Sequence, residues 1–304
     1  MHPRLNYHGM TDIGRRRSSN QDQFLIAELA PALHVEQSSL PQAEHHSLLG
    51  DTRCTLLVVA DGMGGHAAGG RASTLAVNSL ARHLLSQMRW AFPLAEEGKK
   101  HVRAELMAAV DYCQNEILRE ARQRPEESGM GTTLTLACII DDDLFLAHVG
   151  DSRCYLWRDG RLNQKTHDHT VAQQFVDGGA LDAHEAETSR WSHVLWNVVG
   201  GTATELKPEI HHLKLLPGDK LLLCSDGLTR HVFTDRISAL LSRDLPPQEV
   251  CQTLVNEANE SGGADNVTVI VAAVADRAQE ESGELTSALD ETLPIIHLAP
   301  CTAP

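Results

Sequence analysis

The sequence has no long apolar run. None of its apolar stretches reaches the roughly 18 to 20 residues that a membrane-spanning helix needs. The first residues, Met1-His2-Pro3-Arg4-Leu5-Asn6, also lack the apolar core of a signal peptide. We therefore expect a soluble cytoplasmic protein that has no membrane partner.

Basic residues are scarce relative to acidic ones. The 304 residues include 26 Lys and Arg against 41 Asp and Glu, which gives a formal net charge of -15. This balance argues against nucleic acid and anionic membranes as partners. Apolar residues still make up 42% of the chain, an ordinary globular value that excludes disorder of the whole chain.

Closely spaced cysteine pairs are also missing. None of the 7 cysteines forms a Cys-x-x-Cys pair, and the histidines offer only scattered His-x-His spacings, so the sequence disfavours a zinc site. Cys54, Cys138, Cys154 and Cys224 lie in or beside apolar stretches. We expect them to be buried thiols.

Short apolar runs, many β-branched or alternating, predict a protein rich in strands. These runs are 23–29, 54–60, 132–140, 144–149, 153–157, 209–215, 220–224 and 267–274. Two of the connections, Asp141-Asp142-Asp143 and Asp159-Gly160, are too short for the crossover that parallel strands need. At least part of the sheet is therefore antiparallel.

Helical periodicity falls in consecutive pairs between groups of strands, which indicates α+β layers. It covers 69–89, 101–123, 170–178, 233–242 and 246–260. Residues 31–53 have the composition of a surface loop, and 179–200 show no clear period. We predict one domain over residues 1–275 and a flexible C-terminal tail over 276–304.

Two strands of the buried type each stop at an Asp-Gly pair, Asp61-Gly62 and Asp226-Gly227. An aspartate at the end of a buried strand is costly unless a cation or a donor compensates it, and the glycine allows close approach of the backbone to a ligand. Asp151 ends a third such run. Asp265 and Asp22 each precede a further strand.

If these five strand ends converge, they form a cluster of hard oxygen ligands. Such a cluster selects Mg²⁺ or Mn²⁺ over zinc. Two ions of this kind would hold a bridging water as the nucleophile of a hydrolysis.

Six motifs occur along the chain in a fixed order. They are Thr11-Asp12-x-Gly14 with Arg17 and Asn20-Gln21-Asp22; Val59-Ala60-Asp61-Gly62-Met63-Gly64-Gly65-His66; Gly131-Thr132-Thr133; Val149-Gly150-Asp151-Ser152-Arg153; Ser225-Asp226-Gly227-Leu228; and Asp265-Asn266-Val267-Thr268. Together they resemble the metal-dependent serine/threonine protein phosphatases of the PPM (type 2C) family in its bacterial form. The resemblance covers roughly residues 5–275.

The resemblance implies a four-layer αββα sandwich of two mainly antiparallel sheets flanked by helices, with metals in a cleft at one end. It also implies that the chain hydrolyses phosphoserine and phosphothreonine in proteins through a water that bridges two Mn²⁺ or Mg²⁺ ions, with a third ion in a weaker site. The substrate would be a phosphoprotein targeted by a serine/threonine kinase, and we expect a monomer.

The family's metal ligands map onto this sequence residue by residue. Asp61 would bridge the two metals, and the Gly62 carbonyl would bind the second one. Asp226 and Asp265 would hold the first metal, while Asp22 would bind metal-coordinated water. These roles are implied by the resemblance alone.

Three further site residues follow from the same resemblance. Asp151, sharing Asp226, would supply the third and weaker metal site. Arg17 would clamp the substrate phosphate, a task that suits a bidentate guanidinium because it neutralises two phosphate oxygens without being a nucleophile. His66 is a candidate for substrate contact or for a hydrogen bond at a helix start. Residues 168–200 would form a flap beside the site.

The sequence does not identify the general acid that would protonate the leaving group. Some family members have a histidine directly after the first Asp-Gly, where this chain has Met63. The nearest histidine is His66, which the positive end of a helix dipole would keep neutral. We favour a water on the third metal, held by Asp151, as the proton donor.

Two alternatives within this fold remain: a phosphatase of small phosphomonoesters, and a non-catalytic phosphoprotein-binding module. The second is disfavoured because the four principal carboxylates are all present. A dinucleotide-binding loop at 62–67 is disfavoured because Asp61 would face the pyrophosphate with like charge. We interpret His167-Asp168-His169 as a polar cluster beside the flap, and Ser225 as a strand residue that flanks a ligand.

Overall fold

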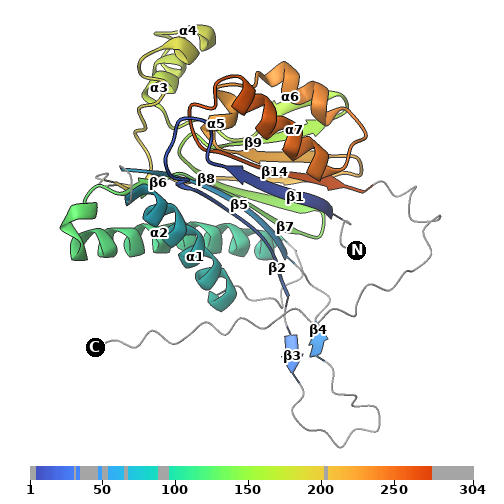
Figure 1. Cartoon of the computed structure of the whole chain (residues 1–304). Helices are drawn as coiled ribbons and strands as arrows, with labels where there is room; N and C mark the ends of the chain where they lie inside the picture. Colours follow the sequence, from blue (N-terminus) through green and yellow to red (C-terminus); the bar gives the residue numbers. More distant parts are fainter. Residues whose placement is uncertain are drawn as a thin grey trace, which may run out of the picture.

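Two antiparallel sheets lie face to face, and helices cover both outer faces (Figure 1). This computed structural model describes residues 5–30, 32–34, 47–49, 54–64, 68–87, 96–201 and 205–275. The predicted tail 276–304 and most of the predicted loop 31–53 lie outside these ranges.

The first sheet has the strand order β1-β14-β13-β9-β10. Its strands are β1 (Leu5–Asp12), β14 (Val267–Val274), β13 (Lys220–Cys224), β9 (Arg153–Arg158) and β10 (Arg161–Gln164). Arg158 pairs with Arg161 across the turn Asp159-Gly160, where both turn residues have positive φ. The turn is therefore the tight antiparallel hairpin that the sequence predicted.

The second sheet has the order β11-β6-β5-β7-β8-β12, and β2 pairs with β5. Its strands are β11 (Val199–Gly200), β6 (Gly131–Thr132), β5 (Cys54–Met63), β7 (Leu134–Ile140), β8 (Asp143–Val149), β12 (Glu209–Lys214) and β2 (Asp22–Leu29). A short separate pair joins β3 (Ala32–His34) to β4 (Ser47–Leu49).

Helices form the two outer layers (Figure 1). The second sheet is covered by α1 (Ala68–Gln87) and α2 (Glu96–Gln123), and the first by α5 (Asp226–Thr229), α6 (Thr234–Leu241) and α7 (Pro247–Glu260). A single 3₁₀ turn, η1 (Pro125–Glu127), follows α2. The short helices α3 (Val171–Asp177) and α4 (Ala183–Thr188) project from one end of the sandwich. The predicted αββα class is confirmed.

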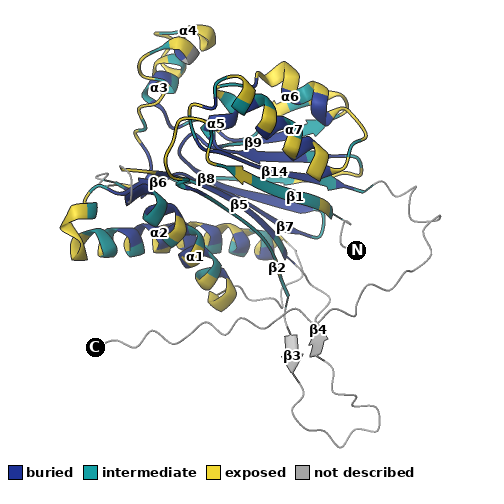
Figure 2. Cartoon of the chain, in the orientation of Figure 1, coloured by how far each residue is buried: buried dark blue, intermediate teal, exposed yellow. Residues whose placement is uncertain are grey.

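The alternation of side chains along each strand explains the layering. On β5, Leu57 and Val59 enter the core between the sheets, whereas Leu56 and Val58 enter the core under α1 and α2. Because successive side chains of a strand point to opposite faces, a strand buried on both sides has apolar residues at every position. Figure 2 accordingly shows the central strands as the buried part of the molecule.

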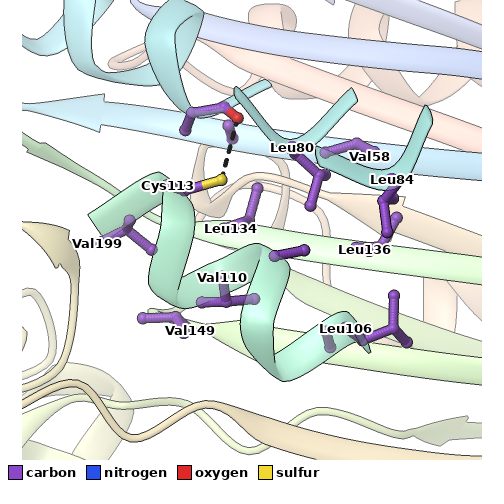
Figure 3. Close-up of a cluster of buried hydrophobic side chains, with 14 of the residues drawn as sticks. Val58, Leu80, Leu84, Leu106, Val110, Cys113, Leu134, Leu136, Val149 and Val199 are labelled. Carbon is purple, nitrogen blue, oxygen red and sulfur yellow. Dashed lines mark hydrogen bonds between the residues drawn. The ribbon is translucent and has the colours of Figure 1, made fainter. Parts of the chain in front are cut away.

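The core under α1 and α2 consists mainly of aliphatic side chains (Figure 3). Leu80 and Leu84 of α1 meet Leu106 and Val110 of α2 over the sheet, and all four are buried. Full burial of such a side chain contributes about 1.5 to 3 kcal/mol. The four cysteines predicted as buried thiols are buried and free, as are Cys113 and Cys251.

Several predictions of secondary structure differ from the structure, among them the absence of strands over β10 and over β3 and β4. The run 132–140 breaks at Thr133, whose backbone N–H donates to Asp61 O at 2.9 Å instead of extending the strand. The stretch 179–200 contains α4 and β11, and α4 begins at a capping box formed by Asp182 and Glu185. No strand was predicted over β1, which is only partly apolar and is stabilised by pairing with β14 along eight residues.

No helix within the described ranges combines the length and the apolar character that crossing a bilayer requires.

Candidate metal centre

The five predicted carboxylates meet at one end of the sandwich. Asp22 and Asp61 are direct partners in the pairing of β2 with β5 in the second sheet. Asp226 follows β13 and Asp265 precedes β14, and these two strands are neighbours in the first sheet. Asp151 lies in the connection from β8 to β9, which crosses from the second sheet to the first. Both sheets therefore contribute acids to one site.

A cavity of about 450 Å³ opens over these acids. Its wall includes four of the five carboxylates, those of Asp61, Asp151, Asp226 and Asp265. Asp22 is not part of the wall: it is buried behind Asp61, with an exposed fraction of 2%. The structure thus separates the carboxylates that face the cavity from the one that supports them.

Asp22 is held by hydroxyl groups from the first sheet. Ser225 Oγ and Thr268 Oγ1 each donate to its Oδ2 at 2.7 Å. Thr268 in turn accepts from Thr11, which accepts from the Asn20 side chain at 2.9 Å. The chain of donors therefore runs through three of the six sequence motifs, and it explains why hydroxyl residues accompany the acids. Ser225, which was predicted as a strand residue, instead precedes α5 and adjoins Asp226.

The backbone around Asp61 is fixed by two threonines. Thr133 Oγ1 accepts from the Asp61 N–H at 2.9 Å, and Thr132 Oγ1 donates to the Asp61 carbonyl at 2.8 Å. Thr133 also bonds Ser152 at 2.7 Å, next to Asp151. The Gly-Thr-Thr motif therefore sets the spacing between two cavity acids, a role that the sequence alone did not reveal.

The glycines of the two Asp-Gly pairs are required by packing. A Cβ on Gly62 would lie 2.2 Å from the carbonyl oxygen of Gly69 in α1, and a Cβ on Gly227 would lie 1.9 Å from that of Asn266. A side chain at either position would push a carboxylate-bearing segment out of place. The sequence predicted close approach to a ligand, whereas the structure shows close approach of two backbone segments.

Burial and mutual repulsion disfavour the charged form of the acids. Burial, followed by the charges of Asp22 and Asp226, raises the pKa of Asp61 well above its ordinary value. Burial likewise raises the pKa of Asp151, and it raises the pKa of Asp22 to about 6 against the opposing hydrogen bonds from Ser225 and Thr268. The arginines of the cavity wall therefore do not fully compensate the negative charge of the acids.

The donor set fits a hard divalent cation. Oδ1 of Asp22 and Oδ1 of Asp226 are buried and have no hydrogen-bond partner among the residues that the structure describes. A buried carboxylate oxygen without a partner is costly, and a cation at this position would compensate it. Because the acids offer only oxygen ligands, the residues suit Mg²⁺ or Mn²⁺.

Arg17 reaches the cavity from the loop between β1 and β2. Its Nη2 donates to Asp265 Oδ2 at 2.7 Å, and its side chain is 49% exposed. Asn266 holds this loop: its side-chain amide donates to the carbonyls of Ile13 and Ser19 and accepts from the Gln21 N–H. The loop thus holds the Arg17 guanidinium beside the acids.

Several cavity residues were not predicted. Arg16, His193, Leu195 and Arg230 also line the wall. His193 and Leu195 belong to the predicted flap, so that segment does reach the site. Arg230, four residues after Asp226, could have been noticed as a basic residue one helical turn from a ligand. His66, by contrast, lies outside the described residues.

A second buried cluster lies beside the cavity, where His148, His169 and Glu209 bring possible ligand atoms within 4.8 Å of one another. His148 Nε2 donates to the His167 carbonyl, and its Nδ1 bonds Thr135 at 2.9 Å. His169 Nδ1 accepts from the Gly150 N–H and the Asn197 side chain, and its Nε2 faces Glu209 at 3.6 Å. Every ring nitrogen of this cluster therefore has a protein partner.

Asp168 lies between His167 and His169 in the predicted polar cluster beside the flap. It pairs with Arg153.

Comparisons with known proteins show the family of this chain. Residues 33–279 match the family model described as Protein phosphatase 2C. PhpP of Streptococcus pneumoniae is 33% identical over 260 residues, which cover 86% of this chain and 94% of the relative. PstP of Mycobacterium tuberculosis is 39% identical over 222 residues, which cover 73% of this chain and 40% of the relative.

Solved structures show the same fold. The Mycobacterium tuberculosis phosphatase PstP/Ppp superposes with a TM-score of 0.71 at 34% identity, over 89% of this chain and 99% of that one. The catalytic domain of PstP in complex with 2 manganese ions gives a TM-score of 0.69 at 34% identity, over 90% and 99% of the two chains. These matches confirm the predicted fold and cofactor class. The chain belongs to the protein phosphatase 2C family, and it is a metal-dependent serine/threonine protein phosphatase, as its ordered motifs predicted.

Proposed function

We propose that the acidic cavity is the active site, where phosphoserine and phosphothreonine side chains of protein substrates are hydrolysed. The observation that supports this most directly is the convergence of acids from both sheets around one cavity with a guanidinium at its edge. Bound Mn²⁺ or Mg²⁺ ions supply Lewis acidity and lower the pKa of water, so that a nucleophile is available at neutral pH.

The residues of the chain divide the work. Asp61, Asp226 and Asp265 would hold the two principal ions, together with the Gly62 carbonyl, while Asp22 supports Asp61 from behind. Asp151 would supply a weaker third site with Asp226. The hydroxyl groups of Ser225 and Thr268 keep the Asp22 side chain in place, so little reorganisation of this carboxylate would accompany the reaction.

Arg17 would orient the substrate. Its guanidinium stands at the cavity edge, 2.7 Å from Asp265, and half of its side chain reaches solvent. A planar guanidinium binds two phosphate oxygens at once and cannot act as a nucleophile. This role is compatible with direct attack by water and with the absence of a phosphorylated enzyme.

We further infer the setting of this activity. The phosphatase would be a monomeric cytoplasmic enzyme that reverses the action of a serine/threonine kinase. Its domain would span 1–275, because β14 ends at Val274 and is paired along its length with β1 at the N-terminus. Residues 276–304 would then be a tail outside the domain.

The function is tested by hydrolysis of a phosphothreonine peptide with Mn²⁺ and after chelation with EDTA. We expect turnover only with the metal, and loss of turnover in Asp61→Asn but not in Asp111→Asn, a control at an exposed position on α2. Comparable activity on a sugar phosphate would favour the small-molecule alternative, and binding of the phosphopeptide without turnover would favour a non-catalytic module. Trapping of a phosphoryl group on the protein would contradict direct attack by water.

A further inference from the structure

Arg230 spans two of the assigned metal ligands. It follows α5 and lies one helical turn after Asp226, where its Nη2 donates to Asp226 Oδ2. Its Nη1 donates to Asp265 Oδ2 at 3.1 Å. One guanidinium therefore joins a ligand at the end of β13 to a ligand at the start of β14.

These two carboxylates are the whole set of side-chain partners that Arg230 has within the described part of the chain. Other partly buried arginines pair with acids away from the cavity: Arg153 with Asp168, and Arg158 with Asp219. Arg230 differs because both of its partners are assigned metal ligands.

Both oxygens of Asp265 accept hydrogen bonds from the protein. Oδ2 accepts from both Arg230 and Arg17, and Oδ1 accepts from the Asn266 N–H at 2.9 Å. Asp226, by contrast, keeps one buried oxygen without a partner among the described residues. A cation bound by both acids would therefore compete with the donors on Asp265, most directly with the two guanidinium groups on Oδ2.

Arg230 is the donor whose displacement would free both acids, because Arg17 is hydrogen-bonded to Asp265 and not to Asp226. Arg17 approaches Asp265 from a loop that Asn266 ties down through three hydrogen bonds. Arg230 has only its own side chain to move, and that side chain is 29% exposed at the cavity wall. A divalent cation would also repel the guanidinium from the site that it occupies.

We propose that Arg230 is an internal counter-ion, which occupies Asp226 and Asp265 in the metal-free protein and competes with the divalent cation for them. It stabilises the crowded acids while the metal is absent and weakens metal binding by the same interaction. The inference rests on the proposed assignment of these two acids as metal ligands.

The test compares Arg230→Ala, Arg230→Gln and Arg230→Lys with the wild type. Isothermal titration with MnCl₂ should show about tenfold tighter binding in the Ala and Gln variants, because a hydrogen-bonded charge pair of this kind no longer has to be broken. The Lys variant should lie in between. Arg236→Ala is the matched control, since Arg236 pairs with Glu257 away from the cavity; its affinity for Mn²⁺ should be unchanged.

Thermal unfolding gives a second readout that does not depend on activity. In EDTA the Ala and Gln variants should melt below the wild type, whereas in saturating Mn²⁺ the difference should vanish or reverse. Unchanged or weaker Mn²⁺ affinity in both variants would overturn the proposal.

A parallel Mn²⁺ titration of Asp226→Ala tests the counter-ion proposal separately from the proposed function. If this variant binds Mn²⁺ as the wild type does, the ligand assignment fails, and the counter-ion proposal fails with it. If Asp226→Ala loses Mn²⁺ and Arg230→Ala gains affinity, but no phosphopeptide is hydrolysed, the counter-ion proposal stands and the proposed function fails.

Discussion

Two clusters of ionisable side chains meet at the segment Gly150-Asp151, and they differ in how their polar atoms are satisfied. Among the acids of the metal centre, Oδ1 of Asp22 and Oδ1 of Asp226 have no hydrogen-bond partner within the described residues. In the cluster of His148, His169 and Glu209, every ring nitrogen has a partner from the protein. A cluster with unsatisfied buried oxygens can bind a ligand, whereas a cluster whose polar atoms all have protein partners stabilises the fold.

The largest expected effect is the loss of turnover when an acid of the metal centre is replaced. Asp61→Ala should reduce phosphopeptide turnover by roughly a thousandfold or more, because a bridging ligand is lost. The metal-free protein should keep or gain stability, since one of several mutually repelling acids is removed. Steady-state kinetics in Mn²⁺ and urea unfolding in EDTA measure the two quantities. A large loss of stability with normal turnover would make Asp61 a structural residue.

The opposite behaviour is expected of His169. Its replacement by Ala removes a buried ring and leaves the Gly150 N–H and the Asn197 amide without their acceptor, which should cost about 2 to 4 kcal/mol of unfolding free energy. The number of Mn²⁺ ions bound, determined by titration of the purified protein, should not change. If His169→Ala instead loses a metal ion and keeps its stability, the histidine cluster is a metal site.

The two clusters should also respond to acid in opposite directions. Burial and the neighbouring His169 lower the pKa of His148 to about 4, whereas a histidine in the unfolded chain titrates near 6.5. The buried neutral ring of His148 therefore costs no stability above about pH 6.5. As the pH falls towards 4, the unfolded chain binds a proton that the folded protein does not, and the free energy of unfolding decreases by an amount on the order of 2 kcal/mol. The cavity acids have raised pKa values, so in the metal-free protein their protonation offsets part of this loss.

Urea unfolding in EDTA between pH 7.5 and 4.5 measures this balance. A His148→Gln variant lacks the titrating ring and should lose less stability over the same range than the wild type. Parallel losses in the two proteins would mean that His148 does not titrate in this way.

The smallest expected effect concerns Asp151, the cavity acid that follows Gly150, a hydrogen-bond partner of His169. Asp151→Ala should lower turnover by about tenfold to a hundredfold, within the range of general acid catalysis, while the tighter pair of metal sites remains. His66→Ala should have a weaker effect than Asp151→Ala on a phosphopeptide. An aryl phosphate, whose leaving group needs little protonation, serves as the comparison substrate. A loss of about a thousandfold in His66→Ala on the peptide alone would identify His66 as the general acid.

The sequence by itself determined the class of fold and the chemistry of the site. Strands apolar at every position, such as Leu56 to Ala60, must be buried on both faces, and short Asp-rich turns allow only antiparallel pairing. Acids at the ends of such strands indicated a hard cation, and the ordered motifs indicated the family. These properties depend on short stretches of chain, so local patterns were sufficient.

Only the tertiary structure decided which acids face the cavity and what holds them. Asp22 and Asp61 are far apart in the chain yet stand opposite each other in one ladder, and Ser225 and Thr268 reach Asp22 from the other sheet. Arg230 and the histidine cluster gain their roles in the same way, from segments that are distant in the sequence and lie side by side in one sheet. Such partnerships follow from register and packing between distant segments, which no local pattern in the sequence specifies.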